Sequence, residues 1–241
     1  MRCSRIVALC IIAAFALCAF AAGAQATPLA YYACVKVPPK TTGHYADGEC
    51  SKPVGSGGKY ERESAVGVTY KAKTKSVTFI STEMPIDGHL TCKHSSDVGM
   101  ITGSSVGEDQ ATFTGCEAET GRCTSAGEPK GTIKTGVLKT ELVGPESSPK
   151  IKFTPSHQFS SGSECGTFLL RVGGFAVGTY TAPPGGHANK KATEIFGGEE
   201  NLTMEFSPNG GEEWFDEEFG GYQTEESTTA ESTDSEPVGI D

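Results

Sequence analysis

Short runs in which apolar and polar residues alternate fill most of the chain between Glu61 and Ser207. Gly, Pro, Asp or Ser breaks these runs about every eight to twelve residues,. Successive side chains of a strand point to opposite faces, so this pattern is typical of antiparallel sheets with one buried face. We therefore expect a β-rich core domain over residues 61–208.

Eleven segments fit this pattern, and many of their apolar positions carry the β-branched or aromatic side chains that suit a half-buried sheet,. They are Ala65–Ala72, Ser76–Ser81, His89–Cys92, Gly99–Thr102, Ala111–Thr114, Gly131–Val137, Lys139–Val143, Lys150–Thr154, Thr167–Val172, Phe175–Thr181 and Asn201–Phe206. The 31 glycines disfavour long helices,. The expected fold is all-β, an antiparallel β-sandwich or barrel of about ten short strands stapled by disulfides.

The first 26 residues have the organisation of a secretory signal peptide. Arg2 and Arg5 precede an uncharged apolar run from Ile6 to Ala22, and small residues follow at Ala24 and Ala26, where we expect cleavage,. An uncleaved membrane anchor is the weaker alternative, because the run is short for a bilayer span. No later segment is long and apolar enough to be a transmembrane helix,. The prediction is a protein that is secreted or held at the cell surface.

Six cysteines remain after the leader: Cys34, Cys50, Cys92, Cys116, Cys123 and Cys165. In an exported chain an even number of cysteines predicts disulfides, although six permit 15 pairings. We favour Cys34 with Cys50, Cys116 with Cys123, and Cys92 with Cys165. The first two bonds would close short polar loops that hydrophobic burial could not hold, each stabilising by roughly 2 to 4 kcal/mol.

The net charge of −10 is distributed unevenly. Every Lys and Arg lies at or before Lys191, whereas 15 of the 30 acidic residues follow it. Without a basic cluster to neutralise phosphates, nucleic acid is not an expected partner. Residues 209–241 are predicted to form an acidic, largely disordered tail, and residues 27–60 a disulfide-closed loop or hairpin.

Three motifs carry possible chemistry, and each also has a simpler interpretation. Gly103-Ser104-Ser105-Val106-Gly107 matches the nucleophile elbow of α/β-hydrolases, but a strand rather than a helix is expected to follow it,. His89, Cys92 and His94 could bind zinc only from a turn, because on a strand His89 faces away from the other two. The acids Glu212, Glu213, Asp216, Glu217 and Glu218 lack the spacing of an EF-hand loop,. We therefore assign no catalytic residue, metal ligand or cofactor.

Several segments, half of which contain a cysteine, resemble a family of uncharacterised, signal-peptide-bearing, β-rich secreted proteins of soil actinobacteria. The segments are His89–Cys92, Gly99–Gly103, Val106, Phe113–Cys116, Cys123–Ser125, Gly131–Thr135, Leu138–Leu142, Glu164–Gly166 and Asn201–Phe206, with Tyr32–Cys34, Gly43–Tyr45 and Glu49–Cys50 nearer the N-terminus. These segments are spread over about two thirds of the mature chain. It implies a β-rich exported architecture and supports pairing Cys116 with Cys123 and Cys92 with Cys165. It implies no active site.

The function expected from these features is that of a secreted, non-enzymatic β module. It would have a structural role in the cell envelope or bind a surface ligand such as an envelope glycan or protein. The alternatives are a secreted hydrolase that uses Ser105 and a small inhibitor-like module at residues 34–50.

Overall fold

The computed structural model describes residues 28–74, 77–80, 89–181, 188–189, 191–196, 201–208, 215–218, 221–224, 228–232 and 237–241. These residues form antiparallel strands and no helix, so the all-β prediction is confirmed. The signal-peptide prediction lies outside the described residues. The strands are β1 (Tyr31–Lys36), β2 (Gly43–Tyr45), β3 (Pro53–Gly58), β4 (Tyr60–Ser64), β5 (Thr69–Thr74), β6 (Val77–Ile80), β7 (His89–Cys92), β8 (His94–Ile101), β9 (Val106–Thr114), β10 (Glu117–Ala118), β11 (Gly121–Thr124), β12 (Thr132–Lys134), β13 (Leu138–Val143), β14 (Lys150–Pro155), β15 (Phe159–Cys165), β16 (Phe168–Thr181), β17 (Lys191–Phe196), β18 (Asn201–Pro208), β19 (Phe215–Glu218), β20 (Gly221–Thr224), β21 (Thr228–Ser232) and β22 (Val238–Ile240).

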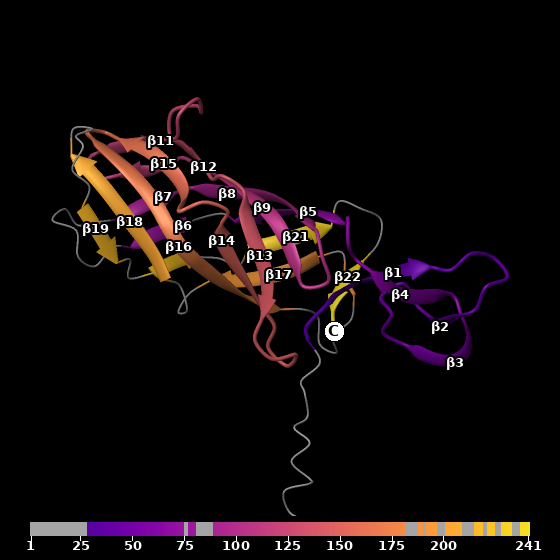
Figure 1. Ribbon diagram of the computed structural model, residues 1–241. Coiled ribbons are helices and arrows are strands. Elements are labelled where there is room, and N and C mark those ends of the chain that lie inside the picture. The colour runs from indigo at the N-terminus through magenta and orange to yellow at the C-terminus, as the bar shows by residue number, and fades with distance from the viewer. Residues whose placement is uncertain are drawn as a thin grey trace, which may run out of the picture.

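Eight of these strands close into a barrel, which lies in the middle of Figure 1. Starting from β9, each strand pairs antiparallel with the next in the order β9, β8, β5, β21, β17, β16, β14, β13, and β13 pairs with β9 again. Alternation along β8 and β9 decides which side chains enter it. Ser95, Gly99 and Ile101 of β8, and Ala111 and Phe113 of β9, are buried, while the residues next to them along each strand are more exposed.

A second sheet continues from the barrel through the long strand β16. The sheet runs β20, β6, β7, β10, β11, β15, β16, β18, β19. The first half of β16, up to Phe175, pairs with β18, whereas its second half, from Ala176, pairs with β14 of the barrel. Gly173 and Gly174 lie at this change of partner, and Gly174 has a φ of 79°, a conformation that residues with a Cβ rarely adopt,. β16 is therefore shared by both parts of the core.

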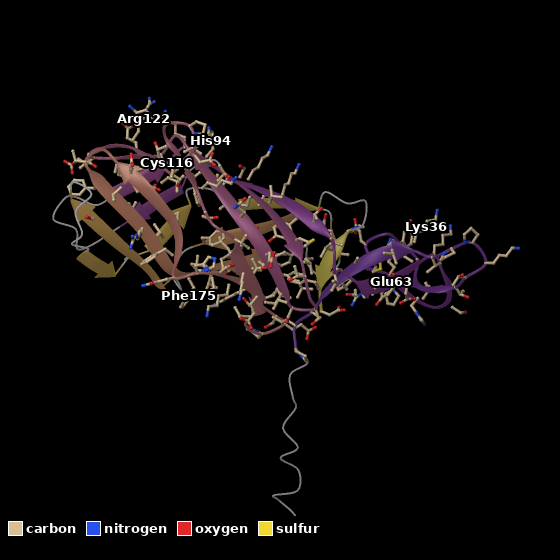
Figure 2. All side chains as sticks on the ribbon, turned by 45° about the horizontal axis from the view of Figure 1, so that its top comes forward. Lys36, Glu63, His94, Cys116, Arg122 and Phe175 are labelled. Atoms are coloured by element: carbon tan, nitrogen blue, oxygen red, sulfur yellow. A yellow bond between two sulfur atoms is a disulfide. The ribbon has the colours of Figure 1, made fainter. Side chains whose placement is uncertain are left out.

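A five-stranded sheet in the order β22, β1, β4, β2, β3 lies at the other end of the molecule (Figure 1). The guanidinium of Arg62 stacks on the ring of Tyr32, 4.2 Å from its centroid, and forms an ion pair with Asp241. Backbone hydrogen bonds also join this sheet to the barrel: the amide of Tyr31 donates to the carbonyl of Ser104 over 2.7 Å. Figure 2 shows Lys36 and Glu63 on this sheet, far from Cys116 and Arg122.

Residues 209–241 are only partly described, so the acidic, largely disordered tail expected there stays a prediction. The described residues of this segment lie largely in β19, β20, β21 and β22, and β21 completes the barrel between β17 and β5. β22 pairs with β1, and its residues Gly239 and Ile240 are buried. The remaining residues of the segment lie outside the part that the structure describes.

All six cysteines that were expected to be oxidised form disulfides, but two of the three predicted pairs are wrong. Cys34 bonds to Cys50 as expected, whereas Cys92 bonds to Cys116 and Cys123 bonds to Cys165. These last four cysteines are buried and lie in one row across neighbouring strands. Glu117 pairs with both Thr91 and Arg122, which places its neighbour Cys116 between Cys92 and Cys123.

This row of cysteines explains why pairing the cysteines that are closest in sequence gives the wrong partner for Cys116. Cys116 has a cysteine on each side of it, so closeness in sequence to Cys123 does not decide its partner. A bond between Cys116 and Cys123 would leave Cys92 and Cys165 about three strand spacings, or roughly 14 Å, apart. A disulfide requires Cα atoms within about 7 Å. Only pairing at the two ends of the row lets all four sulfurs form bonds.

Tryptic digestion of the unreduced protein tests this pairing, because Lys93, Arg122, Lys130 and Lys152 separate the four cysteines into four peptides. We expect mass spectrometry to find residues 76–93 linked to 94–122, and residues 123–130 linked to 153–171. Digestion below neutral pH keeps thiolates scarce and limits disulfide exchange. A link between 94–122 and 123–130 would contradict the structure.

Candidate functional site

A cavity of about 90 Å³ lies between the barrel and the second sheet. It is lined mainly by apolar side chains from both parts of the core. The lining residues are Leu90, Asp97, Ala111, Phe113, Ile133, Thr135, Leu138, Phe153, Pro155, Ser161, Val172, Gly173, Gly174, Phe175, Ala176 and Phe196. A closed protein cavity of about 150 Å³ accepts benzene. This one is smaller but partly open to solvent, so it can take a short chain or part of a single ring while the rest of the ligand projects outward.

Small residues leave this space open. β9 turns Ala111 inward between Asp109 and Phe113, and β16 contributes Gly173, Gly174 and Ala176 at its change of partner. Larger side chains at these positions would fill the space, because protein interiors otherwise pack as densely as organic crystals. The cavity is thus a consequence of where β16 passes from one sheet to the other.

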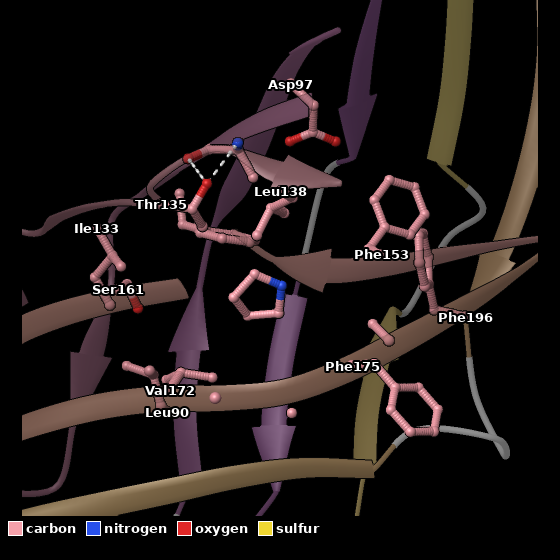
Figure 3. Close-up of a pocket in the computed structure, with 16 residues that line it drawn as sticks. Leu90, Asp97, Ile133, Thr135, Leu138, Phe153, Ser161, Val172, Phe175 and Phe196 are labelled. Carbon is pink, nitrogen blue, oxygen red and sulfur yellow. Dashed lines mark hydrogen bonds between the residues drawn. The ribbon is translucent and has the colours of Figure 1, made fainter. Parts of the chain in front are cut away.

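Polar groups are few in the lining, and one of them is committed to the backbone. The hydroxyl of Thr135 accepts a hydrogen bond from the amide of Ala111 over 2.9 Å and donates one to the Ala111 carbonyl over 3.3 Å. Figure 3 shows both bonds, and it shows the carboxylate of Asp97 on the same side of the cavity as Leu138. Asp97 is the only ionisable residue among the described lining residues.

Aromatic rings gather at one side of the cavity. The centroids of Phe153 and Phe196 are 5.7 Å apart with their planes tilted by 49°, a favourable geometry for an aromatic pair,. Phe175 lies nearby in Figure 3, and the ammonium of Lys152 lies 4.3 Å from the centroid of its ring. This side of the cavity therefore offers both apolar contact and ring faces that attract cations.

A second carboxyl group is buried inside the barrel, at Asp109. Gly99 pairs with Asp109 on one side and with Tyr70 on the other. The ring of Tyr70 lies over Gly99, because a Cβ added to Gly99 would lie only 2.2 Å from the Cζ atom of Tyr70. Burial raises the pKa of Asp109 from 3.8 to about 6, although a hydrogen bond from Tyr70 partly opposes this shift,.

The residues that the sequence offered for chemistry do not converge on the cavity. Ser105 lies in the turn between β8 and β9, where its carbonyl accepts a hydrogen bond from the Leu142 amide over 2.8 Å. This is a hairpin turn and not the strand-to-helix turn of a nucleophile elbow. The sulfur of Cys92 is bonded to Cys116, and His94 is exposed.

The acidic motif is only partly described. Asp216, Glu217 and Glu218 lie in β19, which pairs with β18, and Glu212 and Glu213 lie outside the described residues. Within the part of the chain that the structure describes, no group of three His, Cys, Asp or Glu is placed to hold a metal ion. No helix in that part could cross a bilayer.

Comparison with known proteins does not extend this description. No protein-family model, curated protein or solved structure matches the chain.

Sequence reasoning missed both Asp97 and Asp109. The available signal was their position, because each falls at the inward phase of an alternating strand that also contains Ile101 or Phe113. An acid on the buried face of a strand is unusual and marks an interior polar site.

The raised pKa of Asp109 predicts a pH dependence of stability. The folded state holds this proton more tightly than the unfolded chain, so stability falls as pH rises from about 4 to about 6 and stays lower above that. The shift corresponds to roughly 3 kcal/mol,. The Asp109→Asn variant keeps an oxygen that can accept a hydrogen bond from Tyr70. We expect its free energy of unfolding, measured with urea at a series of pH values, not to fall between about pH 4 and 6.

Glu108→Gln provides the matched control, because Glu108 is the exposed neighbour of Asp109 on β9. This control should keep the wild-type pH profile. If Asp109→Asn keeps it as well, burial does not perturb the carboxyl group as described.

Proposed function

We propose that this chain is an exported, non-enzymatic β module that binds a small, largely apolar ligand in the cavity between its barrel and its second sheet. The cavity carries the proposal. Concave sites lined by apolar and aromatic side chains with a few polar groups are the usual form of small-molecule sites. Here sixteen lining residues include only three with hydrogen-bonding side chains, Asp97, Thr135 and Ser161.

Binding fits the lining better than catalysis does. Acid–base or nucleophilic catalysis needs reactive groups within hydrogen-bonding reach of each other. The described lining residues include no His, Cys or Lys, and both hydrogen-bonding functions of the Thr135 hydroxyl are engaged with Ala111. A hydrolase acting through Ser105 would have to work from a hairpin turn, which does not supply the usual oxyanion hole of that motif,.

Location outside the cytosol is part of the same proposal. Three disulfides are typical of proteins in an oxidising environment,. The order of charged and apolar segments before Ala26 supports an export signal,. A cell-envelope glycan or protein as an additional partner, and kinship with the secreted actinobacterial proteins, stay predictions.

The proposal is tested by titrating the oxidised, isotope-labelled mature protein with benzyl alcohol, a neutral probe with a single ring. Amide resonances of residues that line the cavity should shift and saturate together. Ala176→Leu adds three carbon atoms to the lining and should weaken this binding about tenfold or more.

Ala126→Leu, the same substitution at an exposed loop position, is the control and should bind like the wild type. Shifts confined to the outer surface, or equal binding by all three proteins, would rule out the cavity as the ligand site.

A further inference from the structure

We propose that the cavity prefers cationic ligands, specifically small apolar amines whose ammonium group pairs with Asp97 while the hydrocarbon part packs among the phenylalanines. This inference rests on the proposed function and adds the chemical class of the ligand. The juxtaposition of one acid with several ring faces around the same apolar space is the observation that carries it.

The described lining residues carry a single charged group, while the Lys152 ammonium lies outside the lining on the ring of Phe175. Asp97 supplies a negative charge, and no Lys, Arg or His is among the described lining residues. Asp97 also interacts with other groups of the protein. A carboxylate offers about four acceptor positions, so one partner can share it with a ligand ammonium. Hydrogen bonds between charged groups are stronger than neutral ones, especially away from bulk water.

The position of Asp97 suits this role. Asp97 pairs with Ala111 across the β8–β9 ladder, next to the small residue that opens the space. Asp109 lies on the same inward face, two residues from Ala111 along β9. It is therefore the diagonal neighbour of Asp97, with the two backbones roughly 7 to 8 Å apart,. When Asp109 is ionised, its charge adds to the negative potential around Asp97 and favours a cation further.

The aromatic side of the cavity favours the same ligands. Ring faces attract cations within about 6 Å of their centroids. The 4.3 Å contact between Lys152 and Phe175 shows that one ring of this group already accepts an ammonium on its face. Because Phe153 and Phe196 also provide apolar contact area, an amine with a short hydrocarbon part fits better than a small inorganic cation, which would leave these surfaces uncovered.

Three probes with one ring and different charge test the preference: benzylamine, which is protonated at neutral pH, benzyl alcohol and benzoate. Isothermal titration of the oxidised mature protein should give benzylamine at least about tenfold tighter binding than benzyl alcohol. Benzoate should bind more weakly than both, because its carboxylate faces Asp97.

Asp97→Asn keeps the size of the side chain and removes its charge. This variant should bind benzylamine and benzyl alcohol within about twofold of each other, while Asp97→Glu keeps the preference. Glu108→Gln removes a charge from the outer face of the same pair of strands and should leave the wild-type ratio unchanged. The dispersion of amide resonances confirms that each variant is folded.

The outcomes separate the two proposals. If benzyl alcohol binds and benzylamine binds no more tightly, the cavity is a ligand site without a preference for amines, and this inference is wrong. If no probe binds, the proposed function fails as well. If Asp97→Asn does not fold, the wild-type ratio and the exclusion of benzoate decide the matter.

Discussion

Closure of the barrel depends on pairing between two strands that are far apart in the chain. β21 pairs with β5 through Ala230 and Ala72, and without this ladder the eight strands would form an open sheet with two unpaired edges. Unpaired edges expose backbone donors and acceptors that recruit other chains. Bringing the ends of so long a segment together costs loop-closure entropy. The other ladders and the side chains packed inside them must offset this cost.

Two of the disulfides restrict the chain inside a cluster of buried apolar residues. The bonds Cys92–Cys116 and Cys123–Cys165 tie β7 and β15 to the small hairpin of β10 and β11, which is too short to be stable alone,. Their sulfurs are also part of the apolar core, together with Leu90, Ile133 and Leu170. Oxidation therefore contributes both covalent restriction and packed volume to the same region.

The sequence was informative wherever apolar residues alternate regularly, and less so elsewhere. His89–Cys92 coincides with β7, and Lys139–Val143 differs from β13 by one residue. β15, from Phe159 to Cys165, was missed because Ser and Gly occupy most of it, and it forms by pairing with β11 and β16 rather than from its own strand propensity,. The disulfide partners of Cys116 and Cys123 could not be derived, since they follow from register between strands distant in sequence. The cavity was equally hidden, because it depends on where β16 changes partners.

The shared strand β16 has a mechanical consequence for binding. Because Gly173 and Gly174 lie in the cavity wall at the point where this strand leaves one sheet for the other, an occupant would touch both sheets and the joint between them. Its binding free energy would then oppose separation of the barrel from the second sheet, as well as unfolding of either part. A bound molecule would therefore stiffen the connection at Gly173 and Gly174, and the protein would bend less at this point under an applied force.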